Sequence, residues 1–133
     1  MPEKVVSRRD MEENDAKQIA EAIGETLLNK VFIEKGKGKY EDRYFIYLPG
    51  EKSPIGSILK DGDDYITLLS YDVLKYAEDS KRALEENLML GSLNSAVRAI
   101  LESHLKEKGF EITRLEGGAY YLVFHIKKTE SSG

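Results

Sequence analysis

The residue best suited to proton transfer is His125, one of two histidines in the chain. Histidine ordinarily gains and loses a proton near neutral pH, which makes it a common general acid or base. Glu111 or Thr113 on a neighbouring strand could orient its imidazole. An enzyme would also need a pocket that joins His125 to a carboxylate such as Asp63 or Asp64. Because no residue stands at the spacing of an H-E-x-x-H site, catalysis is only a hypothesis, and we favour a non-catalytic protein.

The acidic run at residues 61–64, Asp-Gly-Asp-Asp, groups the oxygen ligands that calcium and magnesium prefer. Counted from Asp61, the sixth residue is Ile66, where an EF-hand has glycine, and the twelfth is Asp72, where it has glutamate. Asp-Gly is instead a strong signal for a two-residue β-hairpin turn. The absence of cysteine excludes disulfides, thiolate metal ligands and cysteine nucleophiles. We therefore expect a turn here, and neither a metal nor a cofactor.

Cations and tyrosines alternate along a predicted hairpin at residues 35–47, where they could contact phosphates and stack bases, as sheet-based single-strand binders do. The residues concerned are Lys35, Lys37, Lys39, Tyr40, Arg43, Tyr44 and Tyr47. Glu34, Glu41 and Asp42 offset part of this charge, and the formal net charge of −4 provides no global attraction to nucleic acid. Lysines at a strand edge also serve simply to keep it soluble. Both interpretations remain open.

Hydrophobic periodicity predicts the first half of the fold. Apolar residues recur at helical spacing over residues 7–30, where Ser7 or Asp10 could cap the helix and Gly24 marks a weak point or a close packing contact. The period then changes to two and predicts strands at residues 31–33, 43–48, 55–59 and 65–69. Asp61-Gly62 is the predicted hairpin turn between the last two of these strands.

Two further helices are predicted in the centre of the chain, at residues 72–88 and 93–108. His104 falls on the apolar stripe of the second helix, which is typical of a packed or rim histidine. Between the helices, the run Leu88-Met89-Leu90 is more apolar than a simple connection requires. It indicates either a core turn or a subunit contact.

The chain is predicted to end in a hairpin of strands 110–115 and 119–126. A three-residue loop of Glu116, Gly117 and Gly118, with Gly118 left-handed in a G1 bulge, would place the apolar side chains on one face. These side chains are Phe110, Ile112, Leu122, Phe124 and Ile126. Because the strand 119–126 is apolar on its other face too, we expect an interior strand or one covered by a second subunit.

The order of these elements predicts an α+β fold: a mainly antiparallel sheet of about six strands, with the N-terminal helix and two central helices packed on one face. We expect a single domain over residues 1–133, with flexible tails at 1–7 and 128–133. The longest apolar run, residues 119–124, is far below the roughly 20 residues that span a bilayer. We therefore expect a soluble, cytoplasmic protein without membrane contact, and the low content of Asn and Gln hints at a thermophilic source.

The function that these patterns favour is a small non-catalytic binding or assembly module that forms homo-oligomers, through the C-terminal hairpin or through residues 88–90. Its partners would be further copies of itself or another protein. The alternative is a nucleic-acid-binding module that uses the basic, tyrosine-rich hairpin at residues 35–47.

Overall fold

The computed structural model describes residues 2–70, 93–118 and 120–129, with side chains described from residue 13 in α1 and from residue 98 in α3. The elements are α1 (Pro2–Leu27), β1 (Phe32–Lys35), the 3₁₀ helix η1 (Gly38–Tyr40), β2 (Arg43–Tyr47), β3 (Gly56–Asp61), β4 (Asp64–Ser70), α3 (Leu93–Glu107), β5 (Phe110–Gly117) and β6 (Tyr121–Lys128). All six predicted strands and the predicted helix over 93–108 are confirmed. The predicted helix at 72–88 and the apolar run 88–90 lie outside the described residues.

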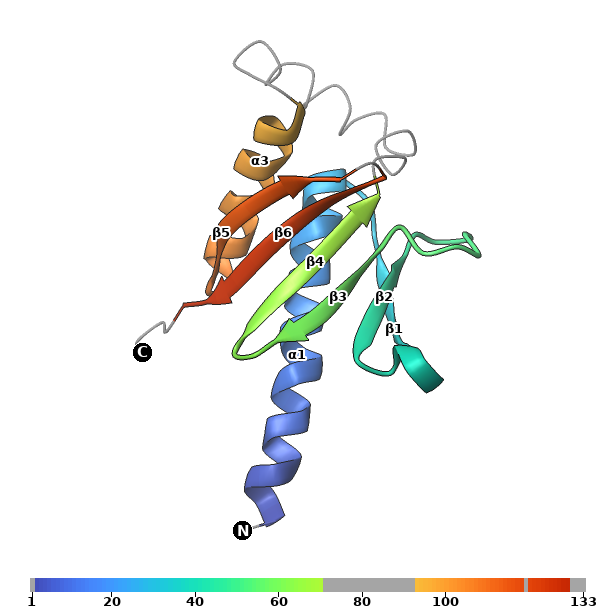
Figure 1. Cartoon of the computed structure of the whole chain (residues 1–133), viewed down its shortest axis with the longest axis vertical. Coiled ribbons are helices and arrows are strands. Elements are labelled where there is room, and N and C mark those ends of the chain that lie inside the picture. Colours follow the sequence, from blue (N-terminus) through green and yellow to red (C-terminus); the bar gives the residue numbers. More distant parts are fainter. Residues whose placement is uncertain (1, 71–92, 119, 130–133) are drawn as a thin grey trace.

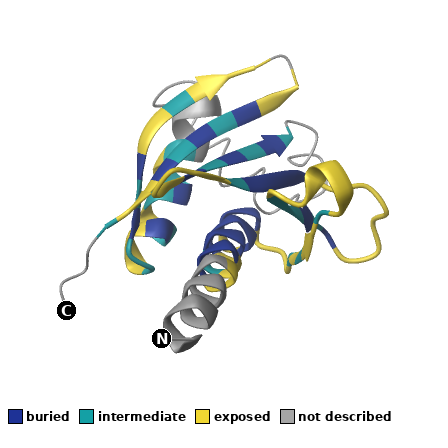
Figure 2. Ribbon diagram, turned by 60° about the horizontal axis from the view of Figure 1, so that its bottom comes forward, coloured by how far each residue is buried: buried dark blue, intermediate teal, exposed yellow. Residues whose placement is uncertain are grey.

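The strands form one six-stranded sheet in the order β1-β2-β3-β4-β6-β5, with every neighbouring pair antiparallel. The first four strands are a meander, and the β5–β6 hairpin joins it through the β4–β6 pair. Both described helices lie behind the sheet in Figure 1 and below it in Figure 2. The α+β class and antiparallel sheet are confirmed, whereas the described ranges hold two α-helices where three were expected on one face.

The start of α1 differs from the prediction. The helix begins at Pro2, so the expected cap at Ser7 or Asp10 is wrong. Proline suits the first turn of a helix, because its missing N–H would have no intrahelical acceptor there and its φ angle is already helical. The helix therefore runs beyond the lower edge of the sheet in Figure 1.

The end of α1 explains why Gly24 interrupts its apolar stripe. Leu28 adopts a left-handed φ of 55°. The Asn29 N–H then donates to the Gly24 carbonyl over 2.9 Å, and the Leu28 N–H donates to the Glu25 carbonyl over 3.3 Å, as in a Schellman cap. A Cβ atom on Gly24 would lie 2.7 Å from the Asn29 carbonyl oxygen. Gly24 is therefore the close packing contact that the sequence allowed for.

The core lies between the helices and one face of the sheet. Alternate residues of the central strands point into it, and α1 and α3 supply its other side. Its fully buried large side chains are Ile19, Ile23, Leu27, Ile46, Ile58, Leu69, Leu101, Leu105, Phe110, Leu122 and Phe124. The five side chains predicted to share a face in the C-terminal hairpin are all buried in this core.

The five side chains are aligned by a different structural feature from the predicted loop. Glu116 and Gly117 pair with Val123 and Leu122 as part of the ladder, and the left-handed glycines among the described residues do not include Gly118. The predicted three-residue loop is therefore wrong. The register shifts instead by a bulge between Ile112 and Arg114, which places Ile112 opposite Ile126. The bulge inserts one residue and so restores the apolar alternation that a regular ladder would break.

A buried polar cluster ties α1 to the middle of the sheet. Asp15 on α1 accepts a hydrogen bond of 2.6 Å from the Tyr65 hydroxyl of β4 and one of 3.0 Å from Lys128 Nζ of β6. Asp15 is only 5% exposed. Because both carboxylate oxygens have donors, the charge is compensated where it is buried.

Thr67, on the core face of β4, provides a test of this packing. Its hydroxyl is buried and has no hydrogen-bond partner in the described part of the chain. We expect Thr67→Val to raise the free energy of unfolding by about 1 kcal/mol, because it removes the cost of an unsatisfied hydroxyl. Thr67→Ser, which keeps the hydroxyl and loses a methyl group, should lower it by a similar amount. Urea denaturation measures both, and a valine variant less stable than wild type would show that the hydroxyl has a partner.

Candidate functional site

The seven residues of the predicted basic surface do not share one face. Tyr44 and Tyr47 are three residues apart on β2 and point to opposite faces of the sheet. Tyr44 packs against the core, whereas Tyr47 points away from the helices. Lys35 shares the face of Tyr44, and Arg43 shares that of Tyr47. Strand alternation therefore divides the cluster into two groups.

The group on the side away from the helices centres on Tyr40, which is 43% exposed. Lys39 Nζ and Arg43 Cζ each lie 5.2 Å from the centroid of its ring, and the Phe45 ring lies edge-on at 5.9 Å. Arg43 Nε also donates to Asp42 Oδ1 over 2.9 Å. This hydrogen bond holds the pKa of Asp42 below its ordinary value. Two of the candidate cations are thus already engaged within the chain.

The group on the helix side lines a pocket of about 290 Å³ between α1 and the lower ends of β1 to β4. Lys35 and Tyr44 face Lys60 and Tyr65 there, and Lys60 Nζ lies 4.6 Å from the centroid of the Tyr65 ring. The remaining walls are Ala16, Glu41, Asp42 and Ile58. Two acidic residues against two lysines give the pocket no net preference for an anion.

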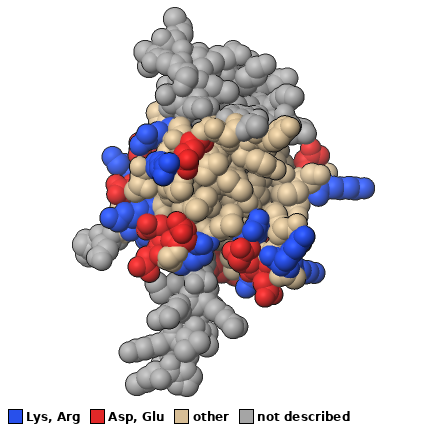
Figure 3. Space-filling view, in the orientation of Figure 1, with Lys and Arg blue, Asp and Glu red and all other residues tan. Residues whose placement is uncertain are grey.

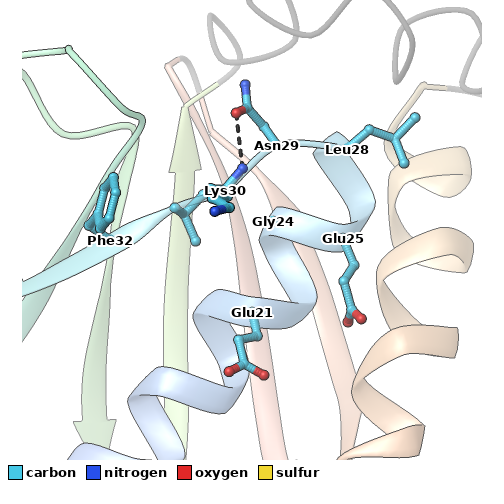
Figure 4. A pocket seen from close by; sticks show the side chains of 8 residues that line it. Glu21, Gly24, Glu25, Leu28, Asn29, Lys30 and Phe32 are labelled. Carbon is cyan, nitrogen blue, oxygen red and sulfur yellow. Dashed lines mark hydrogen bonds between the residues drawn. The ribbon is translucent and has the colours of Figure 1, made fainter.

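A second pocket of about 430 Å³ lies where α1 ends and β1 begins (Figure 4). Leu28 and Phe32, both more than half exposed, lie at its opposite ends. Two of its polar side chains are engaged within the chain: Asn29 Oδ1 accepts from the Lys30 N–H over 2.9 Å, and Glu25 pairs with Lys108 over 2.9 Å. Glu21 also lines the pocket, beside the apolar side chains of Leu28, Val31 and Phe32.

His104 lies at the margin of the same region. Its Nδ1 atom is 3.8 Å from Glu25 Oε1 and 3.7 Å from Glu107 Oε1, and the side chain is 28% exposed. His104 therefore lies at the rim of the core, between two carboxylates on helix surfaces, which is one of the positions that the sequence predicted.

His125 has a partner that the sequence analysis missed. Its Nε2 atom lies 2.7 Å from Glu116 Oε2, and Arg114 donates to Glu116 Oε1 over 3.3 Å. Thr113 donates instead to the His125 backbone carbonyl, so it does not orient the imidazole. The register of β5 against β6 causes this arrangement, because it sets Arg114 opposite His125, and strand alternation keeps Glu116 on the same face.

The Glu116 carboxylate is exposed, and the His125 hydrogen bond, with the Arg114 charge as a second cause, holds its pKa below the ordinary value. His125 belongs to neither of the two pockets described above. No hydrogen bond joins it to Asp63 or Asp64 within the described ranges. The three groups Arg114, Glu116 and His125 form an ion-pair cluster on the side of the sheet turned away from the helices.

The acidic run 61–64 forms the β3–β4 turn, as predicted. Asp61 pairs with Asp64, and Gly62 adopts the positive φ of 65° that a tight hairpin needs. Among the described residues, no group of three or more His, Asp or Glu side chains is arranged to hold a metal ion. No helix among the described residues is long and apolar enough to cross a membrane.

The largest feature that sequence reasoning did not locate is the sheet face turned away from α1 and α3, here called the open face. Apolar side chains occupy its centre, and Figure 3, which views this face, shows charged residues gathered around its margin. The central side chains are Phe45, Tyr47, Leu59, Ile66, Leu68 and Val123. Phe32 (56% exposed) and Tyr121 (45% exposed) extend the surface at one margin.

The signal for this face was present in the sequence. Residues 65–69, apart from Thr67, carry apolar side chains on both faces of the strand, and so does most of the stretch 119–126. Only the pairing of the two strands shows which of these side chains point away from the helices. In the structure β6 is an interior strand between β4 and β5, which confirms that part of the prediction. Its outer side chains, with those of β4, form the centre of the open face.

Comparison with protein-family models, with curated proteins and with solved structures finds no match to this chain. The function is therefore inferred from the chain's own side chains and their arrangement.

The Glu116 cluster has a measurable electrostatic signature. In a carbon-13 NMR titration, the pKa of the Glu116 carboxyl should lie below that of an exposed glutamate, and His125→Gln should raise it more than Arg114→Gln does. Because the folded-state pKa is the lower one, the pair stabilises the fold above the ordinary glutamate pKa and loses this effect as the pH falls through the folded value. An unchanged pKa in His125→Gln would contradict the hydrogen bond.

Proposed function

We propose that this chain is a non-catalytic assembly module that associates with a second copy of itself through the open face of its sheet. The observation that carries the proposal is an apolar sheet face that neither described helix covers. The central side chains of this face are partly buried by their neighbours, and contiguous apolar patches of this kind often mark interaction sites. A sheet buries such a face by packing against another layer, and a second sheet is one of the standard layers.

The size of the open face supports a stable contact. Six strands about 4.8 Å apart, each with about 20 Å of length, present roughly 500–600 Å² per copy, or about 1,000–1,200 Å² in a face-to-face pair. This reaches the area of about 1,000 Å² that a specific interface needs. An apolar centre with a charged margin also matches the usual anatomy of protein–protein interfaces.

The surroundings of His125 favour a non-catalytic role. Its carboxylate partner Glu116 is 44% exposed at the side chain, and neither of the two described pockets includes the pair. A general acid or base works best in a cleft that holds the substrate and excludes water. The cluster fits better as part of the charged margin of an interface.

Sedimentation velocity from about 1 to 100 µM tests the proposal. We expect wild type to shift with concentration to twice the monomer mass of 15.1 kDa. Leu68→Lys, in the centre of the open face, should weaken association by about a hundredfold or more, because it removes apolar contact and buries a charge. Leu68→Thr, which introduces an uncharged residue that favours strands, should weaken association less.

Ala99→Lys, on the exposed surface of α3, is the matched control and should associate like wild type. Circular dichroism establishes that each variant is folded. A wild-type chain that stays monomeric at 100 µM contradicts self-association, and a folded Leu68→Lys variant that still dimerises contradicts the open face as its interface.

Nucleic-acid binding through residues 35–47 is the second candidate. Lys35, Lys37 and Lys39 are exposed, and none forms an ion pair with another residue in the described part of the chain. Lys39 lies beside the exposed Tyr40, and with Lys35 and Lys37 nearby in the chain this segment could bind phosphates and stack a base.

Under this alternative, labelled single-stranded DNA or RNA should bind at micromolar concentration and lose affinity steeply between about 50 and 200 mM salt, because bound counterions are released. Replacing Lys35, Lys37 and Lys39 by alanine should abolish the fluorescence anisotropy signal. Replacing Lys30, Lys52 and Lys106, which are also exposed, should not. An equal loss in both triple variants would show that only general charge is involved.

A further inference from the structure

The strand register arranges the open face into two adjacent rows that cross the sheet. Each row is a chain of directly paired residues, and the two rows are two residues apart along every strand they share. The acidic row contains Glu34, Phe45, Ser57, Leu68, Val123 and Glu116. The basic row contains Arg43, Leu59, Ile66, His125 and Arg114. Both rows are mainly apolar in the middle and charged at their ends.

We propose that two copies pack open face to open face about a two-fold axis that runs across the strands, midway between these two rows. This inference rests on the proposed function and specifies its geometry. The axis exchanges the rows, so each acidic-row residue from β2 to β5 lies over the basic-row residue of the same strand in the other copy, and Glu34 of β1 lies beside Arg43 of the neighbouring strand. Leu68 then meets Ile66 of the second copy, and Glu116 meets its Arg114.

The charges select this axis over the other simple two-fold. An axis parallel to the strands would lay each row on itself in reverse, so that Glu34 of one copy would approach Glu116 of the other. Like charges brought together across an interface are strongly unfavourable. The axis across the strands instead brings Glu116 to Arg114 at one end and Glu34 towards Arg43 at the other, twice each by symmetry.

The packing geometry is compatible with this choice. An axis across the strands keeps the strand directions of the two sheets aligned, which is one of the two common arrangements of packed sheets. The apolar middles of the rows, such as Leu59 and Ile66, then form the centre of the contact. Two sheets at about 10 Å fill the space between them with these side chains.

The ion-pair cluster at the β5 end is already assembled in the single chain. Glu116 accepts from Arg114 over 3.3 Å and lies 2.7 Å from His125 Nε2, while the side chains of Arg114 and Glu116 remain 67% and 44% exposed. A carboxylate offers about four lone-pair positions, so Glu116 can accept from the second copy as well. Groups held in place beforehand lose less conformational entropy on association.

Charge exchange between two variants tests the axis. Arg114→Glu carries two acids at this end of the rows, and Glu116→Arg carries two bases. Each variant alone should dimerise about tenfold more weakly than wild type, because a like-charge contact occurs twice in the two-fold interface. Mixed in equal amounts, the variants should form heterodimers well above the statistical share in native mass spectrometry. The excess should shrink at high salt.

The double variant Arg114→Glu with Glu116→Arg is the control for folding and for the pair within the chain, and it should dimerise like wild type. If wild type dimerises and Leu68→Lys is monomeric, but the mixture shows no excess of heterodimers, the two-fold axis is wrong while the proposed function stands. If wild type is monomeric at all concentrations, both proposals are wrong.

Discussion

The pairing of β4 with β6 is the constraint on which the rest of the structure depends. It joins the N-terminal meander to the C-terminal hairpin, although the paired residues lie more than fifty positions apart in the sequence. Asp15 on α1 links both strands, because its carboxylate accepts hydrogen bonds from Tyr65 on β4 and from Lys128 on β6. Once this register is set, strand alternation decides which face each side chain of β4 and β6 occupies. Leu69 and Leu122 enter the core, and Leu68 and Val123 lie on the open face.

The bulge in β5 extends that constraint to the edge of the sheet. A regular ladder from the Gly117–Leu122 pair would turn Ile112 and Phe110 away from the helices. The inserted residue returns both to the core, while the regular ladder beyond the bulge keeps Arg114 opposite His125 and on the same face as Glu116. One local irregularity thus brings Phe110 and Ile112 into the core without displacing the charged residues that the proposed interface uses.

The proposal of association instead of catalysis depends on a difference between the described surfaces. Catalysis needs polar groups that converge in a recess, whereas Glu25 of one pocket pairs with Lys108 and the other pocket sets two lysines against two acidic residues. The open face has an apolar centre and a charged margin, which is the usual anatomy of a protein–protein contact surface. The basic hairpin at residues 35–47 is a weaker candidate for binding, because alternation along β2 places Tyr44 and Tyr47 on opposite faces of the sheet.

Local pattern alone determined the six strands, the turn at residues 61–64, the α-helices around residues 7–27 and 93–107, and the set of five side chains buried by the C-terminal hairpin. These features depend on neighbours within a few residues, where hydrophobic period and turn chemistry act directly. Tertiary structure decided the strand order, the bulge at Ile112, the Glu116 partner of His125 and the outward direction of Ile66 and Leu68. A strand that is apolar on both faces carries no mark of which face meets the helices, so only its long-range partners can make that choice.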